Sequence, residues 1–144
     1  MTFQTIFKIY GEPVAKGRPR YARRGNFVQT YTPKKTTDYE SVIRENAKKA
    51  MGSSEPLETP LNVLLMFGMP IPSSTPKKLL EAHLDGSIKH TKKPDLDNLA
   101  KAVLDAMNGV VYLDDNQIVR LTIEKKYSKL PLVSISIREV CGPF

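Results

Sequence analysis

Residues 61–69, LNVLLMFGM, restrict the possible folds of this chain more than any other stretch. In an extended chain, one face of this segment carries Leu61, Val63, Leu65, Phe67 and Met69, and the other carries Leu64 and Met66. A strand that is apolar on both faces is typical of the middle of a sheet, where other elements cover it. The segment therefore predicts a central strand, and the rest of the chain must supply its neighbours.

Three further stretches alternate apolar and polar residues as strands do: 3–10, 117–127 and 132–138. In the first of them, Phe3, Phe7 and Ile9 share one face. The last two are joined by SKLP, residues 128–131, which predicts a hairpin loop between antiparallel neighbours.

Apolar residues recur with helical spacing over residues 33–51 and 98–108, and a shorter helix is expected over 76–85. Gly109 suits the end of the second helix. The order strand, helix, strand, helix, strand, strand predicts an α+β fold in which two to three helices pack against a mixed sheet. With 144 residues, 40% of them hydrophobic, the chain fits a single domain spanning residues 1–144.

The charge balance favours a polyanionic partner, because 22 Lys and Arg residues stand against 15 Asp and Glu, for a net charge of +7. Nucleic acid is the best candidate. No stretch reaches the roughly 20 apolar residues of a membrane span, and the start lacks the pattern of a signal peptide, so we expect a cytoplasmic protein with no membrane partner. The single cysteine, Cys141, excludes an intrachain disulfide and a cysteine-based zinc site.

Two basic regions are the candidate DNA-binding surfaces, a loop over residues 11–35 and an insertion over residues 70–93. The first mixes arginine with Tyr, Phe, Gly and Pro, as expected of an extended loop that follows a phosphate backbone. A merely solvated loop is the alternative. The candidate DNA-binding residues are Lys16, Arg18, Arg20, Arg23, Arg24, Lys92 and Lys93.

The sign of the charge reverses over residues 95–115, where Lys101 is the only basic residue among five aspartates. These aspartates are Asp95, Asp97, Asp105, Asp114 and Asp115. Acid on a DNA-binding surface repels phosphate unless a cation offsets it, and carboxylate oxygens suit Mg²⁺ or Mn²⁺. The pattern therefore predicts a divalent-metal site for phosphodiester hydrolysis, with one or two ions.

The spacing suggests how such a site forms. Asp97 is expected to be the N-cap of the second helix, with Asp95 in the extended segment before it and Lys101 one turn inside. The turn that carries Asp114 and Asp115 follows this helix closely and is able to return to its start, which would gather three or four carboxylates. Lys101 would then orient water or the scissile phosphate, or stabilise charge in the transition state.

Structural roles explain each acidic cluster when it is taken alone. Asp97 is a good N-cap, and Lys101 forms an ordinary i,i+4 surface pair with Asp105. Asp114 and Asp115 are typical turn residues. What favours a metal site is the coincidence of both clusters with a lysine and basic surroundings in so short a chain.

Two familiar motifs are excluded. DLDNLA begins like an EF-hand loop, but Ala100 stands at the position that requires glycine. GEPVAKGR is not a Walker A motif, because Lys16 precedes Gly17 and no Ser or Thr follows them.

Residues 92–119, KKPDLDNLAKAVLDAMNGVVYLDDNQIV, closely resemble the core signature of the RusA-type Holliday junction resolvases. These are small phage and prophage endodeoxyribonucleases that cut four-way DNA junctions with Mg²⁺. The match covers the D-L-D-N-L segment, the lysine that follows it, the D-A-M-N-G helix end and the L-D-D-N-Q-I-V turn. GEPVAKGRPRYAR and YTPKKTTDYE resemble the family's N-terminal region.

The resemblance implies that Asp95, Asp97 and Asp115 are the metal-binding catalytic carboxylates and that Lys101 is the catalytic lysine. Asp114 stands at a further acidic position of the family and is a candidate metal ligand. The resemblance also implies Mg²⁺, with Mn²⁺ as a substitute, no small-molecule cofactor, and a homodimer whose two-fold axis matches the symmetry of a junction. A phage or prophage origin and a role in recombination and repair follow from the same resemblance.

Two other functions stay open at this point. A metal-dependent nuclease acting on flaps, forks or ordinary duplex DNA would need the same carboxylates. A non-catalytic DNA-binding module would explain the basic regions but not the acidic clusters.

Overall fold

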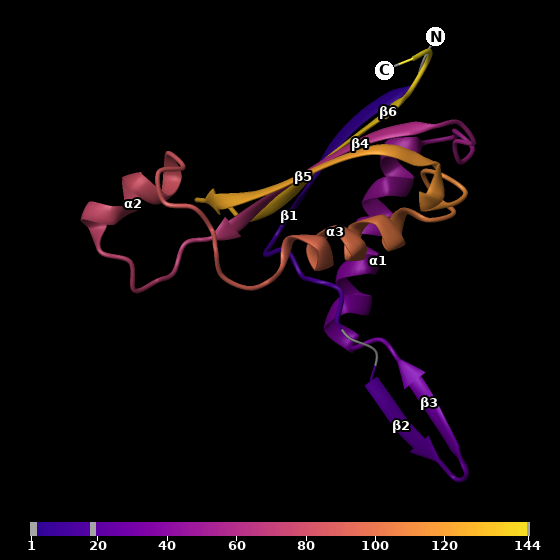
Figure 1. Ribbon diagram of the computed structural model, residues 1–144, viewed down its shortest axis with the longest axis horizontal. Coiled ribbons are helices and arrows are strands. Elements are labelled where there is room, and N and C mark those ends of the chain that lie inside the picture. The colour runs from indigo at the N-terminus through magenta and orange to yellow at the C-terminus, as the bar shows by residue number, and fades with distance from the viewer. Residues whose placement is uncertain (1–2, 18–19, 144) are drawn as a thin grey trace.

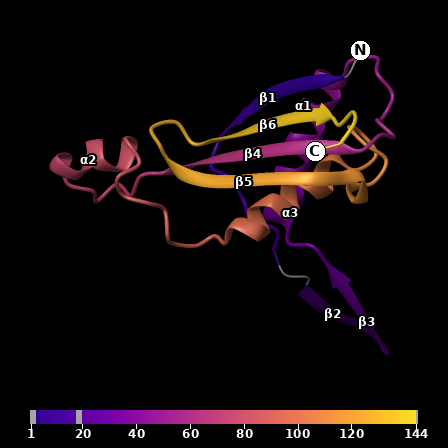
Figure 2. The same ribbon diagram turned by 45° about the horizontal axis from the view of Figure 1, so that its top comes forward.

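The segment expected to be central forms strand β4, Leu61–Pro70, inside a four-stranded sheet. The computed structural model describes residues 3–17 and 20–143. The sheet order is β1-β6-β4-β5, with β1 at Gln4–Tyr10, β5 at Ile118–Ser128 and β6 at Leu132–Glu139. Strand β4 pairs antiparallel with β6 and parallel with β5, so the sheet is mixed as predicted (Figure 2).

The predicted hairpin between the last two strands is wrong. Strands β5 and β6 run in opposite directions, but β4 lies between them. Residues 129–131 therefore cross the end of β4. Gly68 permits this close passage, because a Cβ at that position would lie 2.8 Å from Cβ of Ser128 and 2.9 Å from Cδ2 of Leu132. Apolar alternation indicates where strands are, but it does not say which strand lies between two others.

Two long helices, α1 (Lys34–Met51) and α3 (Leu96–Met107), cover one face of the sheet (Figure 1). Their inner sides and the facing side of the sheet form one hydrophobic core. The largest fully buried side chains include Tyr112, Phe67, Ile43, Leu61, Leu65, Leu99, Ile135 and Ile137. The fold is α+β, as predicted.

The expected third helix is confirmed as α2, Lys77–Leu84, which lies beyond one end of the sheet and within the basic region 70–93 (Figure 1). None of the helices in residues 3–17 and 20–143 combines the length and the apolar character that crossing a membrane requires.

Helix α3 begins at Leu96, so Asp95 occupies its N-cap and the prediction of Asp97 at that position is wrong. Leu96 packs against the core, which favours an earlier start of the helix. Asp95 has the extended backbone of an N-cap residue, with φ −69° and ψ 146°. Asp97 therefore lies in the first helical turn with its side chain exposed.

The interpretation of residues 11–35 as an extended loop is wrong for part of the region, because strands β2 (Arg20–Arg24) and β3 (Phe27–Tyr31) form a hairpin. Gly25 and Asn26 make its turn, and Gly25 adopts φ +61°, which costs little without a Cβ. The Gly-Asn pair, followed by Phe27 and Val28, was the available signal. The hairpin projects away from the sheet (Figure 1).

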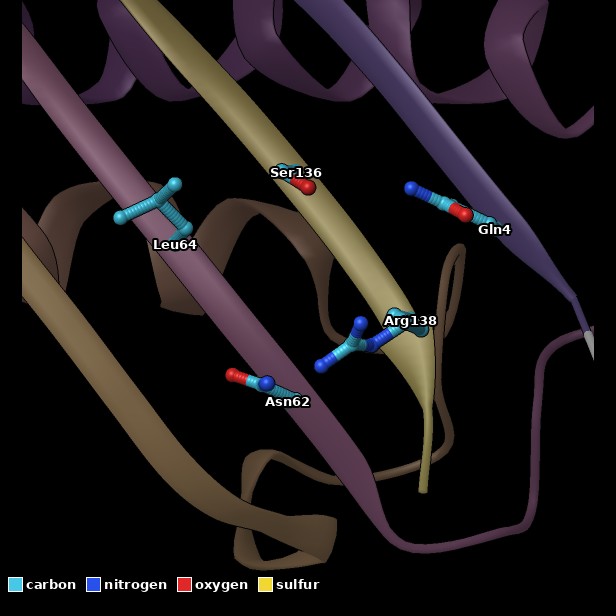
Figure 3. A pocket seen from close by; sticks show the side chains of 5 residues that line it. All are labelled: Gln4, Asn62, Leu64, Ser136 and Arg138. Atoms are coloured by element: carbon cyan, nitrogen blue, oxygen red, sulfur yellow. The ribbon is translucent and has the colours of Figure 1, made fainter. Parts of the chain in front are cut away.

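The face of the sheet opposite α1 and α3 is left uncovered by the described helices (Figure 1). Ile6 is 61% exposed there and Leu64 is 43% exposed. A shallow hollow of about 180 Å³ on this face is lined by Gln4, Asn62, Leu64, Ser136 and Arg138 (Figure 3). None of these residues is a carboxylate, so this hollow is not the predicted acidic site.

Candidate active site

A hollow of about 240 Å³ between α3 and the edge strand β5 brings three of the aspartates together, and we call it the carboxylate pocket. It is lined by Asp97, Ala100, Lys101, Leu104, Asp105, Asp115, Leu121 and Ile123. On α3, Asp97, Lys101 and Asp105 are four residues apart and so follow one stripe of the helix surface. The stripe is polar because the opposite side of α3 is buried in the core.

Asp115 reaches the pocket because the chain folds back onto the end of α3. The backbone N–H of Asp115 donates to Oδ1 of Asn108, the C-cap of α3, at 3.0 Å. The fully buried Tyr112 lies between them in sequence and donates its hydroxyl proton to the carbonyl oxygen of Leu104 at 2.7 Å. These contacts confirm that the acidic turn returns to the helix, although it meets the end of α3 and not its start.

Asp114, by contrast, lies outside the lining of the carboxylate pocket. It is the N-cap of a short 3₁₀ turn, Asp115–Gln117, and its carboxylate accepts from the backbone N–H of Asn116 at 3.1 Å. The side chain of Gln117 completes a capping box, since its Oε1 accepts from the backbone N–H of Asp114 at 3.0 Å. Turn formation therefore accounts for Asp114 structurally, and its metal-binding role stays a prediction.

Asp95 is also outside the lining, although it lies only two residues before Asp97. Its backbone carbonyl accepts from Leu99 at 3.1 Å as the first bond of α3. The segment before it is tied to β5, because Nζ of Lys125 donates to the carbonyl oxygens of Lys92 at 2.8 Å and Pro94 at 2.9 Å. Asp95 is thus held at the start of the helix, exposed and near the pocket in sequence.

Asp105 is the residue of the pocket that sequence reasoning did not select. It was interpreted only as a surface partner of Lys101, and that pair does form, at 3.8 Å. Asp105 also pairs at 3.2 Å with Lys16, which pairs in turn with Glu40 on α1 at 2.6 Å. Its i+4 spacing from Lys101 was the available signal.

Lys16 therefore turns inward, toward two carboxylates, and its predicted contact with DNA stays a prediction. Burial by itself lowers the pKa of Lys16, but hydrogen bonds to Glu40 and Asp105 and the charges of both carboxylates outweigh this effect and raise it. The backbone N–H of Lys16 also donates to the carbonyl oxygen of Asn98 on α3, at 2.9 Å. The segment before the hairpin is thereby fastened to the helix that carries the site.

Electrostatic strain is concentrated at Asp115. Burial raises the pKa of its carboxyl, and a hydrogen bond with Asp114 and the charges of Asp114 and Asp105 raise it further, against an opposing contribution from Asn108. Burial, and after it the charges of the same aspartates, raise the pKa of the Tyr112 hydroxyl. A bound cation would relieve this concentration of negative charge.

The donor set fits a hard divalent cation in its chemistry, because Asp97, Asp105 and Asp115 present carboxylate oxygens to one pocket. As they stand, no three His, Cys, Asp or Glu side chains within residues 3–17 and 20–143 are grouped closely enough to hold a metal ion. Side-chain rotation would be needed to close a coordination shell around Mg²⁺, which usually takes one or two carboxylates and keeps several waters.

The family model for endodeoxyribonuclease RusA matches residues 10–138 of this chain. The chain belongs to the RusA endodeoxyribonuclease family. The matched range contains the whole carboxylate pocket, so the pocket lies in the part of the chain that defines membership. Among curated proteins, the chain is similar to "Uncharacterized protein YqaN" of Bacillus subtilis (strain 168), with 37% identity over 137 residues, 93% of this chain and 95% of that protein.

RusA family membership makes this protein a nuclease that acts on DNA, and its predicted DNA-binding residues lie in two places. Arg20, Arg23 and Arg24 are on β2, where the side chain of Arg23 is exposed. Arg18 lies outside the described residues. Lys92 and Lys93 are exposed directly before α3.

Proposed function

We propose that this RusA family protein is a Mg²⁺-dependent endonuclease that resolves four-way DNA junctions by paired, symmetric nicks. The observation that carries the proposal is the carboxylate pocket: three aspartates and a lysine line one hollow in a chain whose net charge is +7. On a DNA-binding protein, a local excess of carboxylate is unfavourable unless it serves to hold a cation next to phosphate.

The proposed metal ligands are Asp97 and Asp115, with Asp95 at the start of α3 completing the set that the family resemblance implies. Asp105 and Asp114 would support them as neighbouring carboxylates. When bound, the ion, Mg²⁺ or Mn²⁺, would act as a Lewis acid on the scissile phosphate and lower the pKa of a bound water.

Lys101 would act on the phosphate and not on the metal. Its side chain is 62% exposed, and Nζ lies 3.8 Å from a carboxylate oxygen of Asp105. That contact holds the ammonium group beside the pocket, where it would stabilise negative charge that develops on the phosphoryl oxygens. Nζ has no acceptor lone pair while it is protonated, so a role as general base is not proposed.

A homodimer is part of the proposal, because a four-way junction needs two nicks related by a two-fold axis. Two carboxylate pockets in one assembly would cut both strands without dissociation between the two events. The arginines of β2 and Lys92 with Lys93 would then bind the arms of the junction through their phosphates.

The test is incubation of the purified protein with a synthetic four-way junction of fixed sequence and with a linear duplex, in Mg²⁺ and in EDTA. Paired nicks in opposite strands of the junction are expected in Mg²⁺ alone. In Asp97→Asn, the loss of cleavage rate is expected to exceed the roughly 10- to 100-fold that follows when a group hydrogen-bonded to a metal ligand is removed. Junction binding is expected to be kept or strengthened. Asp38→Asn, on the exposed side of α1, is the matched control.

Each alternative predicts a different result. Equal cutting of junction and duplex would leave a metal-dependent nuclease without junction selectivity. Tight binding with no cutting in any metal would favour a non-catalytic DNA-binding module. Asp97→Asn that cuts at the wild-type rate would overturn the assignment of the pocket.

A further inference from the structure

A second hollow, of about 260 Å³, lies beside the segment that leads into α3, and the function proposed above uses only Lys92 and Lys93 from its lining. Its walls are largely apolar, with contributions from Met69, Pro70, Ile71, Pro72, Pro94 and Tyr127. We call it the Tyr127 pocket. Lys92 and Lys93 also line it, which brings two cations next to an apolar cavity.

Strand β5 links the two hollows. Ile123 lines the carboxylate pocket and Tyr127 lines the Tyr127 pocket, and both side chains point to the helix side of the sheet. Four residues of strand span about 13 Å, which is roughly four base steps along duplex DNA. Nζ of Lys125, between them, donates to the carbonyl oxygens of Lys92 and Pro94, so the segment that leads into α3 is hydrogen-bonded to β5 between the two hollows. A DNA strand with its scissile phosphate in the carboxylate pocket would reach the Tyr127 pocket within a few nucleotides.

Besides the two lysines, the polar residues of the Tyr127 pocket are His90 and Glu12. The ring of His90 meets the edge of the Tyr127 ring with centroids 5.0 Å apart. Nδ1 of His90 is buried and has no hydrogen-bond partner among the described residues. Glu12 supplies a carboxylate acceptor to the same lining.

This combination fits one class of ligand better than others. A free phosphate or a metal ion would leave the apolar walls without a partner, and a duplex is too wide to enter. A single nucleobase has an apolar face for the proline, isoleucine and aromatic walls, and polar edges for His90 and Glu12. The phosphates on either side of that base would meet Lys92 and Lys93.

We propose that the Tyr127 pocket receives one unstacked nucleobase of the DNA strand that is being cut. The inference rests on the proposed function and adds to it a means of preferring branched DNA. Bases at a branch point have already lost part of their stacking, so they enter a pocket at lower cost than bases inside a duplex.

The experiment uses 2-aminopurine, a fluorescent base whose emission rises when it leaves the stack. It is placed in turn at each of about four positions on either side of the branch point of a synthetic junction, and emission is recorded on binding of the full chain in EDTA. We expect a several-fold rise at one position. Ile71→Trp, which fills the pocket, and His90→Ala, which removes the aromatic edge, are each expected to reduce the rise at least twofold.

Val42→Trp is the matched control, because it adds the same side chain at a 48% exposed position on α1, and it is expected to keep the wild-type rise. Circular dichroism identifies any variant that does not fold, and the two pocket variants carry the test independently. No rise at any position, or an undiminished rise in both pocket variants, overturns the inference.

The outcome is separable from that of the proposed function, because base unstacking is measured without metal. Junction cutting in Mg²⁺ without any rise in emission would overturn the base pocket and leave the resolvase proposal standing. A rise in emission that depends on the pocket, in a protein that never cuts DNA, would overturn the resolvase proposal and leave the base pocket standing.

Discussion

Helix α3 and the β2–β3 hairpin are both expected to meet DNA, but they are held in opposite ways. One side of α3 is buried to 1% exposure or less at Leu99, Ala102, Val103 and Ala106, so the core fixes its orientation. The hairpin leaves Phe27 77% exposed and Val28 67% exposed, and none of its described residues belongs to the core.

The difference matches what each region has to do. Catalytic groups must be held within about 0.5 Å of a working geometry, which requires a rigid element with buried support. Phosphate binding tolerates variation because the backbone of DNA is uniform and the attraction is long-ranged. The candidate catalytic Asp97 and Lys101 are accordingly on the helix with a buried side, and three of the predicted DNA-binding arginines are on the projecting hairpin.

The largest expected contrast between the two regions is in stability. Leu99→Ala in α3 should lower the free energy of unfolding by about 2–5 kcal/mol, because it empties a fully buried site. Phe27→Ala in the hairpin should change it by no more than about 0.5 kcal/mol, although it removes a larger side chain. Urea denaturation followed by circular dichroism measures both. Equal losses would mean that the hairpin packs against the rest of the molecule in solution.

The next effect concerns the residue of the pocket that sequence reasoning missed. Asp105→Asn should lower the rate of DNA cleavage by roughly 10- to 100-fold, because Asp105 lines the carboxylate pocket and contacts Lys101. Single-turnover cleavage at saturating protein is the measurement. Asp38→Asn, which breaks the exposed pair with Lys34, should have little effect. A wild-type rate for Asp105→Asn would reduce Asp105 to a structural partner of Lys16.

Substitution of Lys16 tests whether this basic residue near the hairpin supports the carboxylate pocket or binds DNA. Lys16→Met should reduce cleavage by roughly tenfold, since Glu40 and Asp105 lose the cation between them. The dependence of DNA affinity on salt should stay unchanged, because Lys16 faces carboxylates. A shallower salt dependence with an unchanged rate would support the predicted contact with phosphate. Lys34→Met, at an exposed pair on α1, is the matched control.

The hairpin itself should show the opposite behaviour. Replacing Arg20, Arg23 and Arg24 with Ala should make the slope of log affinity against log salt shallower by about 0.9 for each phosphate that the protein no longer neutralises. Cleavage at saturating protein should be almost unaffected. Fluorescence anisotropy at several salt concentrations measures the slope, with Arg44→Ala on the exposed side of α1 as control. An unchanged slope would remove the hairpin from the DNA-binding surface.

The smallest expected effect is a pH-dependent gain in stability. The pKa of Asp115 is raised in the folded protein above its ordinary value of 3.8, so unfolding releases protons and the folded state loses stability as pH rises through that range. Asp115→Asn should therefore melt at a higher temperature than wild type in EDTA at pH 7, and the gain should shrink toward pH 4. Differential scanning fluorimetry across this range is the measurement. A lower melting temperature at pH 7 would show that the carboxylate contributes more through hydrogen bonds than it costs through repulsion.

Much of the fold was predictable because its signals are local. The apolar faces of β4 and α3 depend on residues a few positions apart, so their periodicity identified a central strand and a buried helix. The stripe of Asp97, Lys101 and Asp105 follows from the same helical spacing. The hairpin was not predicted because none of its described residues belongs to the core, so it lacks the apolar alternation of a buried strand, and Gly25 with Asn26 is its main local signal.

Local patterns were enough to predict the four strands of the main sheet, the three helices and the carboxylate stripe on α3. Which elements are neighbours became known only from the folded chain: β4 lies between β5 and β6, Asp115 reaches the pocket while Asp114 caps a turn, and Lys16 pairs with Asp105. Periodicity describes a segment and its own faces. The position of one segment against another depends on how all the buried surfaces fit together, and this fit is a property of the whole chain.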